Sequence, residues 1–312
     1  MGDSKDAGVT IRFPATAELQ VSSQDRYTDP FPTASNILPS NNILFPAQQA
    51  LLYGYFNRIA VADAQIQWRT PNINTYNNTF SWKSYSPNYS GGVSTFTSSI
   101  FTGFFNPTTL GARIQATMNS TEALGGGGVG PLYSTITTDL GDGQLQSVVY
   151  KQAAGNQGTE FAFTTALGPL QQVSQKFYRT VDLNPTKLNN QSTFNTVIEN
   201  TANLAYTNYF DIVSDRLAKY SKVKDSMTRQ KNGQTNVVAR VFLTPYNNKE
   251  QYVGTYPFTM AVDYTTPKYI RWSPSEALYD FDLKLYDEYG QPLYWDPAWS
   301  TEYDLNIQAS EA

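Results

Sequence analysis

The acidic residues between positions 280 and 288 come nearest, in type and spacing, to a catalytic pattern in this chain. Asp280 and Asp282 stand two residues apart in an alternating stretch, and Asp287 and Glu288 follow. Hydrolysis of a glycosidic bond needs two carboxyl groups about 5–10 Å apart, and residues i and i+2 of a strand point the same way. Acids on a solvated strand face have the same spacing, and no cleft signature accompanies them. A glycosidase is therefore the weakest of the functions considered.

Two residue types on which many active sites depend are missing. The chain contains no cysteine and no histidine. This excludes thiol nucleophiles, histidine general bases, Ser-His-Asp triads, disulfides and the usual zinc sites. We therefore expect a binding or structural protein rather than an enzyme, with no catalytic residue, no metal site and no cofactor.

Two loops resemble ligand-binding motifs only in part. The run of four glycines at Gly125–Gly128 lacks the following Lys-Ser/Thr and helix of a phosphate loop, so it predicts a flexible loop. The segment LGDGQ at 140–144 carries two acids without the spacing of an EF-hand, and it is typical of a hairpin turn.

Four of the five tryptophans flank turns, namely Trp82, Trp272, Trp295 and Trp299. Exposed aromatic rings of this kind stack on sugars, so a carbohydrate-binding β-sandwich, such as a fibre or lectin module, is one hypothesis. Tryptophans that close the ends of a β-sandwich core are the alternative, and that role needs no ligand.

The composition is poor in charge and rich in aromatic residues. Of 312 residues, 15% are charged and 14% aromatic, and the formal net charge is −4; typical domains are about 25% charged. Such a surface suits contact with other proteins, although strand propensity also explains the aromatic content. No long basic run is present, so sequence-specific nucleic-acid binding is not expected. Neither a secretory signal nor a membrane-spanning segment is expected.

Alternation with a period of two predicts an all-β protein. Phe281, Leu283 and Leu285 share one face of a strand, and Tyr303, Leu305 and Ile307 share one face of another. Further strands are predicted at 9–13, 18–22, 59–68, 79–85, 134–138, 145–151, 160–164, 193–198, 236–243 and 256–263. The Asn-rich segment between Trp68 and Trp82 predicts a connection between two strands, in which Pro71 ends the ladder.

Two short helices are predicted in the connections. The first, over 106–119, has Asn106 as N-cap, Pro107 at its first position and one apolar stripe. The second, over 207–224, has Asn208 as a possible cap and lysines near its end. The stripes that we expect to face the core are Leu110, Ile114 and Met118 in the first helix, and Phe210, Val213, Leu217 and Tyr220 in the second.

Two weak internal similarities suggest a duplicated plan. FPATAELQV at 13–21 resembles FYRTVDLNP at 177–185, and WRTPNINTYNN at 68–78 resembles FLTPYNNKEQY at 242–252. They occur in the same order and place a boundary near residues 165–180. The predicted domains are 1–170 and 171–312.

Three segments together resemble the capsid proteins of tailless icosahedral viruses with jelly-roll shells. They are AVADAQIQWRTPNINTYNNTFSW, FTGFFNPTTLGARIQATMNS and STITTDLGDGQLQSVVY. The pattern is similar to minor or penton proteins of virophages and polinton-like viruses, and FDLKLYDEYGQPLYW resembles their C-terminal strand. The match covers about half of the chain in patches, and the sequence departs from it at 165–175, where Leu167-Gly168-Pro169 stands.

The resemblance implies a viral jelly roll that assembles into an icosahedral shell. We expect two barrels in tandem, one in 1–170 and one in 171–312, which would make the chain a major capsid protein that forms pseudo-hexagonal trimers. The alternative is a single barrel, which would make it a penton or minor protein at the vertices. The implied partners are further copies, as a homotrimer or homopentamer, and other capsid proteins, with an underlying membrane left open. The implied location is the virion, after assembly in the host cell cytoplasm.

Overall fold

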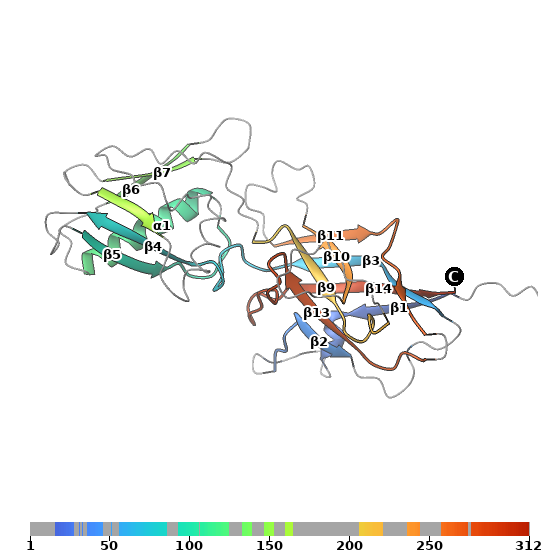
Figure 1. Ribbon diagram of the computed structural model, residues 1–312. Coiled ribbons are helices and arrows are strands. Elements are labelled where there is room, and N and C mark those ends of the chain that lie inside the picture. Colours follow the sequence, from blue (N-terminus) through green and yellow to red (C-terminus); the bar gives the residue numbers. More distant parts are fainter. Residues whose placement is uncertain are drawn as a thin grey trace, which may run out of the picture. The chain divides into compact units, whose positions relative to one another are not determined.

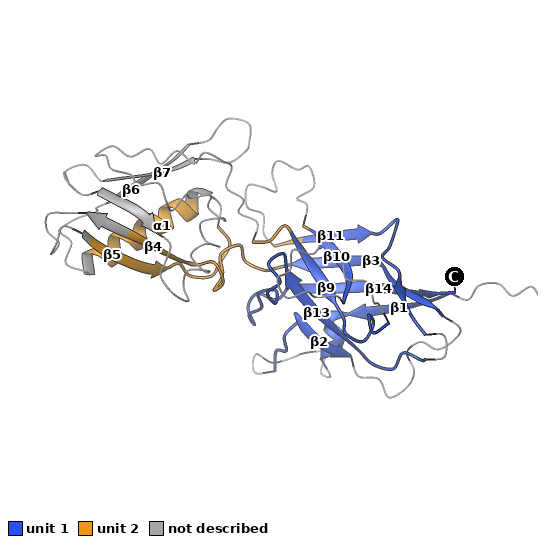
Figure 2. Cartoon of the chain, in the orientation of Figure 1, with its two compact units in different colours: residues 1–68, 209–242, 259–312 blue, residues 69–208, 243–258 orange. Residues whose placement is uncertain are grey.

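The computed structural model describes residues 16–27, 31, 33, 36–45, 51, 56–85, 93–105, 107–124, 133–138, 147–152, 160–164, 206–220, 236–243, 257–273 and 276–311. The chain divides into two compact units (Figure 2). Unit 1 comprises residues 1–68, 209–242 and 259–312, and unit 2 comprises residues 69–208 and 243–258.

Unit 1 is built from two antiparallel sheets (Figure 1). Sheet A has the order β1-β14-β3-β11, with β12 also pairing β3, and sheet B has the order β10-β9-β13-β2. A short 3-10 helix, η1 (Ser23–Arg26), follows β1. The strands are β1 (Thr16–Ser22), β2 (Asn42–Phe45), β3 (Arg58–Trp68), β9 (Tyr209–Val213), β10 (Val237–Phe242), β11 (Phe258–Asp263), β12 (Ile270–Arg271), β13 (Phe281–Asp287) and β14 (Glu302–Ser310).

The strand pairings of unit 1 define a jelly roll. With the two-residue β12 set aside, the first described strand of the barrel pairs with the last (β1 with β14) and the second with the second-last (β2 with β13). The next pairs inward are β3 with β11 and β9 with β10. This is one long antiparallel hairpin wrapped into two facing sheets, which is the jelly-roll plan. The predicted all-β, viral jelly-roll fold is thereby confirmed.

Alternating apolar residues explain why these strands face each other across a core. Ile66 and Ile307 of sheet A and Phe210 of sheet B are fully buried, whereas their strand neighbours Gln65 and Asn306 reach the surface. Trp68, at the end of β3, stacks on Phe210 of the opposite sheet with ring centroids 5.9 Å apart. The two sheets therefore bury one continuous apolar layer, as the period-two pattern requires.

The second predicted helix, over 207–224, is wrong. Residues Tyr209–Val213 form β9, between β10 and β13, and 215–220 form turns. The five residues of β9 are aromatic or β-branched apart from Asp211, which favours a strand. Asp211 is buried and pairs with Arg240 of the neighbouring strand at 2.7 Å. The helical spacing of Phe210, Val213 and Leu217 comes from a strand followed by a turn.

Unit 2 combines two small sheets with a single described helix. The sheets have the orders β5-β4-β8 and β6-β7. Helix α1 begins at Pro107, as predicted, and Leu110, Ile114 and Met118 are buried along one stripe. Its elements are β4 (Thr79–Tyr85), β5 (Val93–Ser99), α1 (Pro107–Leu124), β6 (Tyr133–Thr138), β7 (Ser147–Gln152) and β8 (Glu160–Thr164).

The compact units do not follow the predicted division into 1–170 and 171–312. Unit 1 takes in both ends of the chain, because β1 pairs with β14 from Thr16↔Ser310 to Ser22↔Asp304. Among the described residues one jelly roll is found, and not two in tandem. Residues 165–180, where the boundary was placed, lie outside the described residues, as do 9–13, 125–128, 140–144, 177–185, 193–198 and 244–252.

Most of the predicted strands are confirmed among the described residues, within two residues at each end. Besides β9, which was predicted as part of a helix, three strands were missed, β2, β5 and β12. β2 has only four residues and β12 only two, and β5 is a Ser/Thr-rich segment whose alternation of apolar and polar residues is faint.

Candidate functional site

The acids at the start of β13 contact a neighbouring turn through one ion pair and two hydrogen bonds. Asp280 pairs with Arg216. Asp282 accepts hydrogen bonds from the Ser214 hydroxyl at 3.2 Å and from the Arg216 backbone at 3.1 Å, and it lies 3.2 Å from Lys284. These contacts hold the turn at 214–220 against the sheet, so both carboxylates have structural partners.

Asp287 organises the hairpin that follows β13. It is fully buried, and its Oδ1 accepts hydrogen bonds from the backbone N–H groups of Tyr289 and Gln291, both at 2.9 Å. Gly290 has a φ of 73° in this turn, which favours glycine. Glu288 is half-buried. These acids therefore have structural partners in the part of the chain that the structure describes.

Two of the four tryptophans that flank turns lie in cores, and the other two are partly covered. Trp82 and Trp272 are buried, and Trp295 and Trp299 are half-buried. Trp82 stacks on Phe80 and Phe96 and donates a hydrogen bond from Nε1 to Glu122 at 3.4 Å. Trp82 and Trp272 therefore cannot stack on a sugar, whereas Trp295 and Trp299 are partly accessible.

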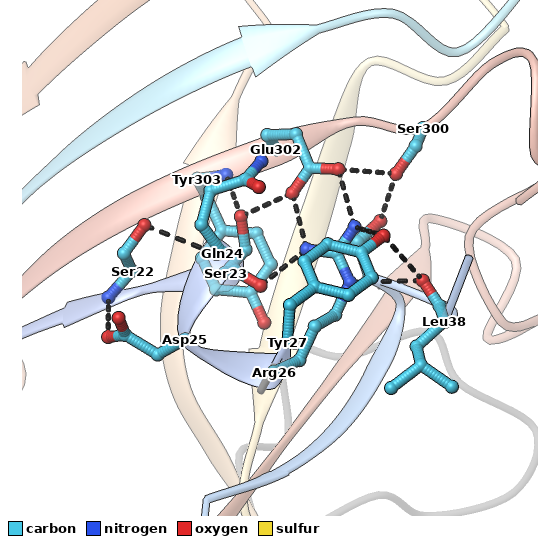
Figure 3. Close-up of polar contacts among 11 residues, drawn as sticks. Ser22, Ser23, Gln24, Asp25, Arg26, Tyr27, Leu38, Ser300, Glu302 and Tyr303 are labelled. Carbon is cyan, nitrogen blue, oxygen red and sulfur yellow. Dashed lines mark hydrogen bonds and ion pairs between the residues drawn. The ribbon is translucent and has the colours of Figure 1, made fainter. Parts of the chain in front are cut away.

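A polar cluster buried beside the first and last strands of the barrel is the most tightly bonded site that sequence reasoning missed (Figure 3). Arg26 of η1 and Glu302 of β14 form a two-pronged pair, with Nη1–Oε2 at 2.6 Å and Nη2–Oε1 at 2.7 Å. Glu302 also accepts from the hydroxyls of Ser23 at 2.6 Å and Ser300 at 2.7 Å. The arginine bonds in addition to the carbonyl oxygens of Leu38 and Ser23.

The ion pair joins the first and last strands of the barrel, because Arg26 follows β1 and Glu302 begins β14. Burial opposes ionisation of Glu302, but hydrogen bonds from Arg26, Ser23 and Ser300 outweigh it and lower the pKa of the carboxyl below its ordinary value. Burial also opposes the charge on Arg26, yet its bond to Glu302 raises the pKa of the guanidinium. Burial raises the pKa of the adjacent Tyr303 phenol strongly. These contacts form a closed structural clamp, and among the described residues they leave no open position for a ligand.

The Asn-rich connection of unit 2 is held by hydrogen bonds from its own asparagine side chains. Asn72 donates to the Phe105 carbonyl at 2.7 Å and accepts from the Phe105 N–H at 2.9 Å. Asn77 accepts from the Asn74 N–H at 2.8 Å and donates to the Asn72 carbonyl at 2.8 Å. The three asparagines are fully buried or nearly so. The predicted connection between two strands is confirmed, and its asparagines replace the backbone partners that a loop lacks.

The outer face of sheet B carries the exposed apolar side chains of the barrel sheets. Phe242, on edge strand β10, is 56% exposed, and Leu44, on edge strand β2, is 54% exposed. Phe242 lies against Tyr209, with ring centroids 5.7 Å apart, and the Arg240 guanidinium lies 4.1 Å from the centre of the Tyr209 ring. We call Phe242, Tyr209 and Arg240 the contact surface, because exposed aromatic rings with arginine are typical of protein interfaces. Leu44 lies apart from it, on the opposite edge strand, where it pairs with Asp282.

The outer face of sheet A is different in chemistry. Exposed or half-buried side chains on β1, β3 and β14 are amides and acids, and Asn306 donates to Asp63 at 3.0 Å. These side chains are Glu18, Gln20, Asp63, Gln65, Gln67, Asp304, Asn306 and Gln308. The two faces of the barrel are therefore unlike, which suits contacts between different faces of neighbouring copies better than contacts between identical ones.

Groups of metal-ligating side chains are not found among the described residues. Within that same part of the chain, no helix has the length and apolar character needed to cross a membrane.

The strand order of unit 1 places the chain in the viral jelly-roll class of folds. The penton protein of mavirus is similar in structure over 96% of this chain and 100% of its own, with a TM-score of 0.50 and 12% sequence identity. A chain of the Sputnik virophage structure is similar over 95% of this chain and 98% of its own, with a TM-score of 0.47 and 13% identity. No protein-family model and no curated protein matches the sequence. The predicted resemblance to virophage jelly-roll proteins is confirmed at the level of the fold.

Proposed function

We propose that this chain is a structural subunit of an icosahedral virus capsid, which assembles with copies of itself and with other capsid proteins. The observation that carries the proposal is the complete jelly-roll strand order of unit 1, together with a likeness to the mavirus penton protein that spans nearly the whole chain. The absence of cysteine and histidine and the structural roles of the acids at 280–288 support a role without enzymatic activity. The virion, after assembly in the host cell cytoplasm, is the corresponding location.

Within this role we favour the vertex position over the major capsid protein. A major capsid protein of the tandem type needs two barrels, whereas the described residues form one barrel whose first and last strands are neighbours. The residues of unit 2 are inserted between β3 and β9, and between β10 and β11. A single barrel with inserted segments is the arrangement expected of a penton, which would assemble as a homopentamer rather than a homotrimer. A membrane beneath the shell is compatible with both.

The assembly is proposed to use the contact surface on sheet B. A closed ring of identical subunits needs a heterologous interface, in which one patch meets a different patch of the next copy. The aromatic side chains of the contact surface supply contact area at low entropic cost, and the amides on the outer face of sheet A supply hydrogen-bond partners.

Native mass spectrometry of the purified full chain tests both levels of the proposal. A pentamer supports the vertex role, a trimer supports the major capsid protein, and a monomer at high concentration refutes the capsid proposal. Phe242→Asp should weaken ring assembly by roughly tenfold or more, because it places a charge in the centre of a buried contact. Phe101→Asp is the matched control, since Phe101 is equally exposed at 55% but lies in unit 2. Equal assembly of both variants would refute the role of the contact surface.

A further inference from the structure

The outer strands of the three larger sheets differ in how they are protected against pairing with another chain. Edge strands in native proteins usually carry charges, bulges or proline, or are very short, because an open edge is a template for a further strand. β1 contains Glu18, β8 contains Glu160 and β11 contains Asp263. β2 has only four residues, and β10 contains Arg240 and a register shift between Val237 and Ala239.

β5 has none of these protections. Its seven residues, VSTFTSS, contain no charge, no proline and no glycine. It pairs with β4 without a register shift, from Thr79↔Ser99 to Tyr85↔Val93, and it ends the order β5-β4-β8. Valine, threonine and phenylalanine favour strands. Within the part of the chain that the structure describes, β5 is therefore a flat and uncharged edge.

The backbone of β5 has a defined orientation toward this edge. Just beyond the strand, the Ile100 N–H donates to the Asn78 carbonyl at 2.9 Å and its carbonyl accepts from the Asn78 side chain at 2.8 Å. Successive residues of a strand direct their N–H and C=O groups to opposite sides. Since Ile100 faces β4, the backbone groups of Ser99, Thr97 and Thr95 face the open edge.

The side chains of β5 show how a partner would fit. Thr95, Thr97 and Ser99 are exposed on one face, where the Thr97 hydroxyl lies 2.8 Å from that of Ser81. Phe96 is half-buried on the opposite face and stacks on Trp82 at 5.5 Å. Rigid packing of Phe96 and the Asn78 contacts fix the edge in an extended form, so pairing would cost little ordering entropy.

We propose that β5 pairs antiparallel with β5 of a second copy of this chain, about a two-fold axis at Phe96. The central sequence Ser-Thr-Phe-Thr-Ser reads the same in both directions. In this register Thr95 lies opposite Thr97 of the second copy, and Phe96 lies opposite its own counterpart. Thr–Thr and aromatic–aromatic cross-strand pairs are favourable, and no like charges meet because the strand has none.

The orientation of the backbone agrees with this register. Thr95 and Thr97 both direct their N–H and C=O groups outward, so each pair of them would exchange two backbone hydrogen bonds. Phe96 directs its backbone groups to β4, so the central pair would be of the narrow, non-hydrogen-bonded kind that brings side chains together. The inference concerns unit 2 alone and does not depend on the proposed shell function.

The test uses charges introduced at the two exposed threonines of the full chain. In Thr95→Lys/Thr97→Lys, each new lysine lies opposite a lysine of the second copy, and self-association measured by sedimentation should weaken by roughly tenfold or more. In Thr95→Lys/Thr97→Glu, each lysine lies opposite a glutamate, and association should return. Thr259→Lys/Ala261→Lys is the matched control, because these are alternating exposed positions on the edge strand β11.

Disulfide cross-linking tests the register of the proposed β5 pair, whether or not the barrels form a ring. The chain has no cysteine, so a mixture of Thr95→Cys and Thr97→Cys chains should form a mixed disulfide, since hydrogen-bonded cross-strand partners have Cα atoms about 5.5 Å apart. Either variant alone should cross-link much less, because its cysteines lie on diagonal positions. Equal association of both charge variants, or no preference for the mixed disulfide, overturns the proposal. If the full chain forms no pentamer or trimer but the two cysteine variants still form the mixed disulfide, the proposed shell function is refuted and the β5 pairing is not.

Discussion

Replacement of Glu302 by glutamine tests whether the buried clamp closes the barrel. The carboxylate accepts four hydrogen bonds, two from Arg26 at 2.6 and 2.7 Å and one each from Ser23 at 2.6 Å and Ser300 at 2.7 Å. Both oxygens of the carboxylate thus face only donors. Glutamine presents an NH2 group to half of them and removes the charge that compensates Arg26.

The expected loss is a large part of the stability of the barrel. The side chains of Arg26 and Glu302 are 3% and 8% exposed, so solvent screens the pair little. Removing one partner of a buried ion pair costs about 3–5 kcal/mol, because the other charge is left uncompensated. Whole domains are stable by about 5–15 kcal/mol. In a domain of this size the loss corresponds to a decrease in Tm of roughly 6–20 °C.

The pH dependence gives the prediction a second readout. The pKa of Glu302 is lowered from its ordinary value of 4.5, so the stabilisation is present at neutral pH and is lost as the pH falls below that value. Glutamine does not titrate. The difference in free energy of unfolding between the wild type and Glu302→Gln should therefore shrink in acid.

Guanidinium unfolding followed by tryptophan fluorescence measures the effect. Unit 1 contains Trp68, Trp272, Trp295 and Trp299, whereas Trp82 belongs to unit 2, so most of the signal reports on the barrel. The double variant Arg26→Met/Glu302→Leu serves as control and should recover much of the loss, since no charge is left unpaired. A loss below about 1 kcal/mol for Glu302→Gln, or a difference that persists unchanged in acid, would refute the reasoning.

Three further predictions concern single side chains. Asn72→Ala leaves the N–H and C=O of Phe105 without their partners and should lower the stability of unit 2 by about 2–5 kcal/mol, seen as faster exchange of the Phe105 amide hydrogen. Gly290→Ala, at a φ of 73°, should cost about 1–2 kcal/mol in thermal unfolding, whereas an unchanged Tm would contradict the strained turn. Burial raises the pKa of Tyr264 from 10.0 to about 12, so its stabilisation is present below pH 10 and lost as the pH approaches about 12. Phenolate absorbance should show a late-titrating tyrosine that is lost in Tyr264→Phe, whereas the fully buried Tyr303 titrates later still.

The strands were predictable because their pattern is local. Leu305 and Ile307 alternate with polar residues, and this period survives in β14 as alternating burial. β9 was missed because its five residues are buried on both faces apart from Tyr209, so no period of two is visible. The turn that follows then added Leu217 at a helical distance, and the combined spacing imitated an amphipathic helix.

The division into units could not be deduced from local pattern. The pairing of Thr16 with Ser310 joins residues from opposite ends of the chain, and neither segment contains a pattern that identifies the other as its partner. The clamp was missed for the same reason, because Arg26 and Glu302 are 276 positions apart. The Asn-rich connection, by contrast, was recognised from its residue types, because asparagine side chains form hydrogen bonds with nearby backbone groups in turns.

The pairing of β1 and β3 with β14 also determines when sheet A can form during synthesis of the chain. Sheet A cannot close until residues 302–310 have been made, although β3 is complete at residue 68. At about 5–20 residues per second, translation of the roughly 230 residues between them takes about 10–50 s. For that interval the edge of β3 that pairs with β14 is open, and an open strand edge is a template for pairing with another chain.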